Sequence, residues 1–280
     1  MRLAHLTDPH LTPLPPGWPG GWPSKRWLSW LSWQRRRRHL HRRERLDALV
    51  ESVRGCRPDA WAVTGDLCQT GTPDEVETAT AWLEQLAPDD RVLVTPGNHD
   101  VFGPGSRARV DAHWAAWLHG PTDRVTVRSF GPVRLIAVDS AVVTPIGSAR
   151  GELGEAGRER LTAALREARG RFRVVLIHHP PAPGLCKRRK ALADDAELAD
   201  LLCREGAGLV LHGHLHHDHR HDLQSADGSA LPVFCTPSAS APDAAARLFD
   251  IEPADGAFRV RMRLVGPDGV SGEETWTSPG

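Results

Sequence analysis

The sequence lacks any long apolar run. None of its 280 residues lies in a stretch that approaches the roughly 20 apolar residues needed for a membrane-spanning helix. The first residues do not form the apolar segment of a signal peptide either, because a charge already occurs at Asp8. We therefore expect a cytoplasmic protein without a spanning helix.

Cysteine is scarce, and none of the five cysteines belongs to a Cys-x-x-Cys pair. Their odd number and wide spacing argue against a disulfide framework and against a zinc knuckle. Cys68, which closely follows Asp66, is interpreted as a small buried residue and not as a metal thiolate. A reducing compartment fits these features.

The chain carries no net charge, but one segment is strongly basic. Hydrophobic residues make up 40% and charged residues 25%, which is typical of a soluble globular domain and fits one domain over residues 1–280. Residues 25–45, however, hold nine Lys or Arg residues against the single acid Glu44. Half of the ten tryptophans lie in or just before this stretch. The segment therefore needs an interpretation of its own.

Short apolar runs alternate with amphipathic segments along most of the chain. Strands are predicted at residues 2–7, 60–64, 91–95, 125–129, 133–138, 174–177 and 209–211. Helices are predicted at residues 44–55, 73–86, 109–119, 155–168 and 194–204. The last part changes to strands separated by turns, at residues 233–236, 246–251 and 258–264. This order predicts two packed sheets with helices outside.

Polar motifs follow five of the predicted strands. They are Asp8-Pro9-His10, Gly65-Asp66, Gly97-Asn98-His99-Asp100, His178-His179 and Gly213-His214-Leu215-His216. In open α/β sheets, ligands bind in the crevice outside the carboxyl ends of the strands, so we expect the motifs to converge. Carboxylate, imidazole and amide groups together suit Zn, Fe or Mn.

The candidate ligands are too numerous for one ion. They are Asp8, His10, Asp66, Asn98, His178, His214 and His216. Two divalent ions about 3.5–4 Å apart could share them, with one carboxylate between the ions, as in sites that clamp the attacking and departing oxygens of phosphate chemistry. Asp66 is the natural bridge.

In this order the motifs resemble those of the calcineurin-like metallophosphoesterase superfamily, and the resemblance extends over residues 1 to about 265. It implies a four-layer αββα sandwich, an α/β fold of two mixed β-sheets flanked by helices. It also implies one metal at Asp8, His10, Asp66 and His216, and another at Asp66, Asn98, His178 and His214. His99 would bind the phosphate and assist the leaving group, and Asp100 would orient His99. Between His178 and His179, the resemblance favours the first as the ligand.

The resemblance implies a hydrolase acting on a phosphodiester or phosphomonoester, but the metal core cannot choose the leaving group. Cyclic-nucleotide and glycerophosphodiester phosphodiesterases are one reading, with a small-molecule phosphodiester as substrate. The UDP-diacylglucosamine pyrophosphatases of lipid A synthesis are the alternative. A scaffold that kept the fold without catalysis is a distant third reading. The oligomeric state cannot be read from the sequence.

Residues 14–43 form an insertion relative to compact members of that superfamily. A helix of interleaved tryptophan and arginine could lie peripherally on the inner membrane or contact a lipid substrate. Alternatively, the tryptophans pack on the sandwich and the arginines face water. Nucleic acid ranks below lipid, because no recognised nucleic-acid module accompanies the segment. The prolines and glycines of residues 13–23 predict an irregular loop.

Two further basic or histidine-rich segments flank the motifs. Residues 187–190 could hold an anionic substrate or form a solvated turn. The histidines that flank the last motif, His212, His217, His219 and His221, are expected to lie in a solvated loop.

Overall fold

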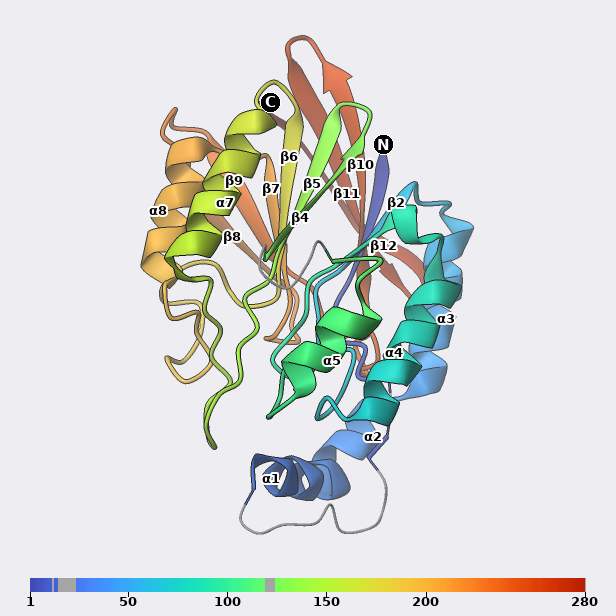
Figure 1. The fold of residues 1–280 in the computed structure, drawn as a ribbon. Helices are drawn as coiled ribbons and strands as arrows, with labels where there is room; N and C mark the ends of the chain where they lie inside the picture. The colour runs from blue at the N-terminus through green and yellow to red at the C-terminus, as the bar shows by residue number, and fades with distance from the viewer. Residues whose placement is uncertain (12, 15–23, 119–123, 280) are drawn as a thin grey trace.

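Two six-stranded β-sheets pack face to face in the computed structural model, which describes residues 1–11, 13–14, 24–118 and 124–279 (Figure 1). The first sheet has the order β12-β11-β10-β1-β2-β3 and contains β1 (Arg2–Leu6), β2 (Ala60–Val63), β3 (Val92–Val94), β10 (Ala246–Ala254), β11 (Ala257–Gly266) and β12 (Gly269–Ser278). The second has the order β4-β5-β6-β7-β9-β8 and contains β4 (Val125–Phe130), β5 (Val133–Val138), β6 (Phe172–Ile177), β7 (Leu209–His212), β8 (His219–Gln224) and β9 (Ala230–Cys235). Both sheets are mixed, since parallel strands in each are extended by antiparallel ones.

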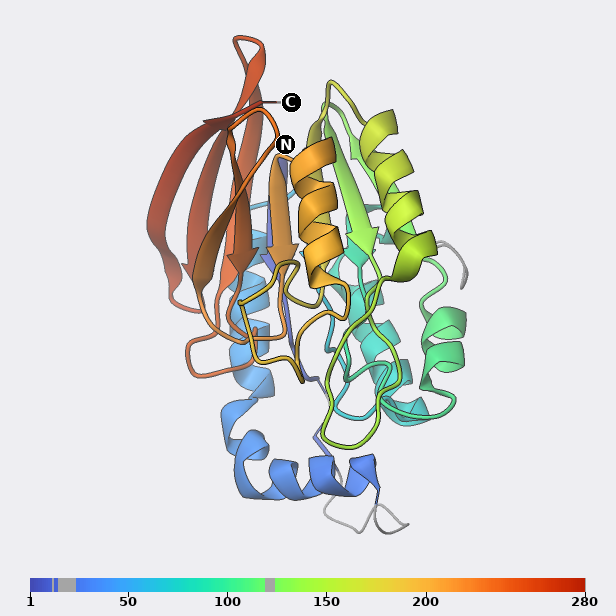
Figure 2. The same ribbon diagram turned by 90° about the vertical axis from the view of Figure 1, so that its left-hand side faces the viewer.

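Helices cover the outer face of each sheet. Helices α3 (Arg43–Gly55) and α4 (Pro73–Leu86) lie on the first sheet, with α5 (Ser106–His113) beside α4, and α7 (Gly154–Glu167) and α8 (Asp195–Glu205) lie on the second (Figure 2). A short 3₁₀ turn, η2 (Asp89–Arg91), precedes β3. The predicted four-layer αββα sandwich is confirmed.

Three apolar clusters hold the four layers together. The middle cluster joins the inner faces of the sheets through side chains such as Leu3 and Leu93 of the first and Phe172 of the second. The other two lie between each sheet and its helices. Burial of an apolar stripe on each helix is the expected source of this packing, because isolated helices of this length are marginal in water.

Most predicted elements are confirmed, with ends that differ by a few residues. The helix expected at residues 109–119 instead runs over Ser106–His113, and residue 119 lies outside the described residues. Strands β8 and β12 were not predicted. Both are edge strands with many exposed polar residues, so they lack the apolar pattern that identifies a strand in a sequence.

The described part of the insertion is helical and lies across the carboxyl ends of the strands (Figure 1). It consists of α1 (Lys25–Ser32), the π-helix η1 (Trp33–Arg37) and α2 (Arg38–Leu40). The Ser24 hydroxyl caps α1 by accepting a hydrogen bond from the Trp27 amide. Most of the loop expected at residues 13–23 lies outside the described residues.

No helix in the described ranges is long and apolar enough to span a bilayer. Contact of the insertion with lipid or nucleic acid stays a prediction, as does the organisation of residues 1–280 as one domain.

Candidate metal centre

The five motifs meet at one edge of the sandwich, because the strands that precede them end there. The loops after β1 and β2 are paired by their backbones: the Asp8 amide donates to the Gly65 carbonyl and the His10 amide to the Asp66 carbonyl, both at 3.0 Å. Short contacts link all seven predicted ligands. Their convergence follows from the topology that the sequence predicts.

Asp100 joins three of these loops. Its buried carboxylate accepts hydrogen bonds from the backbone amides of Asp66 at 2.9 Å, Cys68 at 2.8 Å and Gly97 at 2.8 Å. Burial raises the pKa of Asp100 to about 6, against the opposing effect of these amides. Because both carboxylate oxygens are engaged in this way, Asp100 positions the backbone of the site.

Orientation of His99 by Asp100 stays a prediction, and the structure shows another partner for the His99 ring. The His99 Nδ1 atom lies 2.5 Å from the Gln69 carbonyl oxygen, so this backbone carbonyl fixes the imidazole. The His99 amide donates to Asp66 Oδ1 at 2.7 Å, and the ring stacks on Phe102 with centroids 5.5 Å apart. His99 is thus held beside Asp66 while its Nε2 atom is left for other partners.

Backbone carbonyls also fix the tautomers of two predicted ligands. His10 Nδ1 lies 3.0 Å from the Cys68 carbonyl oxygen, and His178 Nδ1 lies 2.7 Å from that of Thr64. Burial lowers the pKa of both imidazoles, so each is neutral and carries its proton on Nδ1. The Nε2 lone pairs are left as potential metal ligands, the arrangement usual for metal-binding histidines.

The first group of ligand atoms contains two carboxylates and two imidazoles. Single donor atoms of Asp8, His10, Asp66 and His216 all lie within 4.8 Å of one another. Asp8 is held by the Thr7 hydroxyl at 2.6 Å and the His214 amide at 2.9 Å, and its other oxygen lies 3.0 Å from His216 Nε2. These four residues are the set that the family resemblance implies for one metal.

The second group converges on His178 Nε2. This atom lies 3.3 Å from Asn98 Oδ1, 3.2 Å from His214 Nδ1 and 3.5 Å from Asp66 Oδ2. With the His178 proton on Nδ1, lone pairs of nitrogen and oxygen face one another. His214 Nε2 is buried and has no hydrogen-bond partner among the described residues, so either tautomer of His214 leaves an unsatisfied atom. A cation among these donors relieves both problems, and the residues therefore fit a metal.

Asp8 and Asp66 respond to this crowding in opposite directions. Burial opposes ionisation of Asp8, but the neighbouring His216 outweighs it and lowers the pKa of Asp8. Burial and the charge of Asp8 raise the pKa of Asp66 well above its usual range. Two carboxylates so close together are costly without positive charge between them. The electrostatics of the site also favour a bound cation.

The backbone of the site is strained. Of eight described non-glycine residues with positive φ, five are predicted ligands: Asp8, His10, Asp66, His214 and His216, with φ between 44° and 70°. Asp and His tolerate this left-handed region better than most residues, yet it remains uncommon and clusters at functional sites. This backbone conformation directs the side chains of the motifs toward the same centre.

Two glycines permit the close approach of the loops. A Cβ atom on Gly97 would lie 2.2 Å from Asp66 Oδ1, and one on Gly213 would lie 1.9 Å from Thr7 Oγ1. No side chain fits at either position without displacing Asp66 or Asp8. The glycines of the motifs are therefore part of the ligand cradle.

The ambiguity between His178 and His179 has a geometric basis. Nitrogen atoms of His178, His179 and His214 lie within 4.8 Å of one another, and His179 Nδ1 lies 2.8 Å from the Ser140 hydroxyl. The short contacts to Asn98 and Asp66, however, are made by His178. This geometry favours His178 as the ligand.

Other expectations about single residues have mixed outcomes. Cys68 is fully buried, as expected. His212 is the last residue of β7 and is 1% exposed, so its assignment to a solvated loop is wrong. His217 is exposed as expected, whereas His219 and His221 belong to β8.

Two insertion residues reach the centre although no motif marked them. The imidazole of His41 lies 4.4 Å from that of His10 between centroids, and its Nδ1 lies 2.9 Å from the Ser240 hydroxyl. Nitrogens of His10, His41 and His216 form a third group within 4.8 Å. Arg37 is the second residue, with one guanidinium nitrogen 3.3 Å from His10 Nδ1. The predictions for this basic segment, contact with lipid or nucleic acid or exposure to water, do not include a place at the centre.

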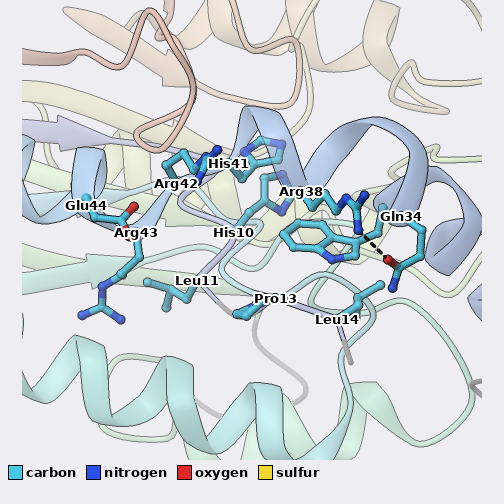
Figure 3. A pocket seen from close by; sticks show the side chains of 11 residues that line it. His10, Leu11, Pro13, Leu14, Gln34, Arg38, His41, Arg42, Arg43 and Glu44 are labelled. Carbon is cyan, nitrogen blue, oxygen red and sulfur yellow. Dashed lines mark hydrogen bonds between the residues drawn. The ribbon is translucent and has the colours of Figure 1, made fainter. Parts of the chain in front are cut away.

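A cavity of about 360 Å³ opens beside His10. Figure 3 shows His10 and His41 side by side in its wall, with Leu11 and Leu14 on the apolar part and Arg38 on the basic part. Its size is that of a small-molecule site, and its lining mixes apolar with cationic groups. The centre therefore adjoins space for an organic substituent.

Comparison with known proteins agrees with this geometry. A probable cyclic nucleotide phosphodiesterase of Synechococcus sp. is 31% identical over 93% of this chain and 95% of its own length. One of Rhodococcus erythropolis is 33% identical over 62% of this chain and 56% of its own. A cAMP/cGMP dual specificity phosphodiesterase of Mycobacterium tuberculosis is 28% identical over 62% of this chain and 54% of its own length. The matches thus cover about half the length of the last two relatives.

Solved structures share the fold at low sequence identity. A purple acid phosphatase from yellow lupin seeds has a TM-score of 0.60 at 12% identity. The match covers 99% of this chain and 53% of the phosphatase chain. The family model described as calcineurin-like phosphoesterase matches residues 1–218. Divalent metal ions are implied by this match and by the clustered ligands. The chain belongs to the calcineurin-like phosphoesterase family.

Proposed function

We propose that this protein is a dinuclear metal-dependent hydrolase that cleaves a small-molecule phosphodiester. The observation that carries the proposal is the position of Asp66, which belongs to the first ligand group and lies 3.5 Å from His178 in the second. One carboxylate shared by two groups is the arrangement of a two-metal site. The nitrogen and oxygen donors suit Mn, Fe or Zn.

The chain's own residues hold and orient the reacting groups. Asp8, His10, Asp66 and His216 would hold one ion, and Asp66, Asn98, His178 and His214 the other. When bound, such ions activate water as a nucleophile and neutralise phosphoryl oxygens. The imidazole of His99 is fixed at Nδ1 by the Gln69 carbonyl, which leaves Nε2 available. Once protonated at Nε2 from solvent, His99 would donate a hydrogen bond to the phosphate and pass that proton to the leaving group.

Two observations favour a phosphodiester over a phosphomonoester. The relatives from Synechococcus and Mycobacterium are named as phosphodiesterases of cyclic nucleotides, and a further relative from Enterobacter lignolyticus, 28% identical over 58% of this chain, is named as a glycerophosphodiester phosphodiesterase. The cavity beside His10 provides room for the second ester substituent. A monoester would leave this space unused.

A substrate panel tests the proposal. The protein is stripped of metal, reloaded with Mn and assayed on bis-p-nitrophenyl phosphate, cyclic AMP, a glycerophosphodiester, a phosphomonoester and a UDP-linked acylated sugar. We expect hydrolysis of at least one diester, and loss of that activity when metal is removed. Asp66→Asn keeps the size of the shared residue and should abolish the activity. The control variant His113→Ala changes an exposed histidine and should retain the activity.

Other outcomes of the panel separate the competing readings. Hydrolysis of the UDP-linked lipid alone would assign the leaving group to the pyrophosphatase reading. If the metal-loaded protein hydrolysed none of the esters, the proposal would be wrong. Failure of the folded protein to take up metal would instead support the non-catalytic scaffold.

A further inference from the structure

The insertion spans the mouth of the metal centre and is fixed on both sides of it. At its start, the Lys25 ammonium donates to the Thr144 hydroxyl at 2.7 Å and lies 4.4 Å from the centroid of the Phe102 ring. At its end, His41 Nδ1 lies 2.9 Å from the hydroxyl of Ser240, in the loop between β9 and β10. The residues between these anchors are therefore held over the ligand groups.

Arg37 contacts the centre, unlike the three arginines beside it in the chain. Arg35, Arg36 and Arg38 are exposed, whereas Arg37 is partly buried at the end of the π-helix η1. One of its guanidinium nitrogens lies 3.3 Å from His10 Nδ1 and 3.4 Å from His10 Nε2. Single π-helical turns are rare and often occur at functional sites, where they change which side chains face inward.

Arg37 lies at the centre without a matching ion pair. No carboxylate among the described residues forms a salt bridge with it, although Asp66 and Asp8 are near enough to favour its charged form. An arginine side chain stays protonated near neutral pH, so the cation persists. A partly buried cation whose fork of donors is largely unused is suited to an anionic ligand.

We propose that Arg37 binds the phosphoryl group of the substrate at the metal centre, so that the insertion supplies a binding residue that the five motifs lack. The inference rests on the proposed function, because the phosphoryl group would lie between Arg37 and the two ligand groups. A planar guanidinium donates two parallel hydrogen bonds to phosphate oxygens, which fixes the orientation of the group as well as its charge. The insertion thereby becomes part of the substrate site.

A different role would leave a different signature. If Arg37 served only to neutralise the charges of Asp8 and Asp66, it would compete with metal and would not contact phosphate. Its removal would then strengthen metal binding and leave phosphate affinity unchanged.

The test measures binding of inorganic phosphate to the Mn-loaded full-length protein by calorimetry, with metal content measured in parallel. The variants are Arg37→Ala, Arg37→Lys and the matched control Arg36→Ala, which removes the same charge from the adjacent exposed position. We expect Arg37→Ala to weaken phosphate binding roughly 10- to 100-fold, the range of a charge-assisted hydrogen bond. Arg37→Lys should recover part of the affinity, and Arg36→Ala should stay within about twofold of wild type.

Metal content equal to wild type in Arg37→Ala is part of the expected result. Unchanged phosphate affinity in the metal-loaded Arg37→Ala protein would overturn the inference, and so would an equal loss in Arg36→Ala. Failure of the two proposals can be distinguished. Arg37-dependent phosphate binding without hydrolysis of any ester contradicts only the proposed function, whereas ester hydrolysis with Arg37-independent phosphate binding contradicts only this inference.

Discussion

His178 Nε2 lies 3.3 Å from Asn98 Oδ1, and the proton of the imidazole is on the other nitrogen, 2.7 Å from the Thr64 carbonyl oxygen. Two hydrogen-bond acceptors are thus held together in a buried site, which is unfavourable unless a cation lies between them. This contact between two acceptors destabilises the folded protein when no metal is bound. Metal binding should therefore stabilise the fold as well as complete the site.

The amide of Asn98 is predicted to be required for the second ion. Asn98→Ala removes an oxygen ligand without adding charge, so we expect metal affinity at that position to fall at least about tenfold, by analogy with the cost of disturbing ligand shells. Titration of the metal-free variant with Mn should show one ion bound as in wild type and one bound weakly. Asn98→Asp, which restores an oxygen ligand, serves as the control. Two equally tight ions in Asn98→Ala would contradict the ligand assignment.

His99 is predicted to act in turnover and not in metal binding. Its Nδ1 is fixed by the Gln69 carbonyl, and its ring does not belong to either ligand group. We expect His99→Ala to retain both ions and to lower kcat on a diester by about 10²- to 10⁴-fold, the usual contribution of general acid–base catalysis. His113→Ala, an exposed histidine, is the control. Full activity of metal-loaded His99→Ala on every ester would show that the role is wrong.

The glycine of the third motif is predicted to be irreplaceable. In Gly97→Ala the new methyl group would lie 2.2 Å from Asp66 Oδ1 and 2.5 Å from the Asp66 backbone nitrogen, so the shared carboxylate must move. We expect loss of metal binding measured by metal content after gel filtration. Gly103→Ala adds the same methyl group where no atom lies within 4 Å, and should bind metal like wild type. Equal metal content in the two variants would contradict the cradle.

The convergence of the motifs was predictable because it depends on topology. Asp8, Asp66 and Asn98 follow the parallel strands β1, β2 and β3, and His178 and His214 follow β6 and β7. Parallel neighbouring strands end at the same edge, and apolar runs mark such buried strands clearly. The sequence thus predicted that these segments end at a common edge, whereas the strand order and register come from the structure.

Arg37 and His41 could not be found in the same way. Among the described residues, no strand ends directly before their segment. Its tryptophans and arginines fit a lipid-facing helix as well as a packed one. The decisive contacts are tertiary: Arg37 lies 3.3 Å from His10 Nδ1, and Ser240, 199 residues away in the chain, lies 2.9 Å from His41 Nδ1. The hydrogen bonds that Asp100 accepts from the amides of Asp66, Cys68 and Gly97 leave no mark in the motif, so the sequence could not predict them.

The last prediction concerns the stability of the metal-free protein toward acid. His5 is fully buried between the hydroxyls of Thr64 and Thr236, and burial lowers its pKa to about 3. Because the folded pKa lies below the unfolded value near 6.5, the stabilising contribution is complete above pH 6.5 and is lost as the pH falls below it. Between pH 7.5 and 5.5 this single group should cost about 1 kcal/mol of unfolding free energy.

Buried carboxyls act with the opposite sign in part of the same window, so the test must isolate His5. Asp100, with its pKa raised to about 6, takes up its proton more readily in the folded state and therefore gains stability as the pH falls. In His5→Gln the carboxyl contribution is unchanged and the histidine contribution is absent. Urea unfolding in the presence of a chelator should thus show a loss between pH 7.5 and 5.5 that is smaller by about 1 kcal/mol in His5→Gln than in wild type. An identical loss in both proteins would mean that His5 is protonated equally in the folded and unfolded states, against its burial.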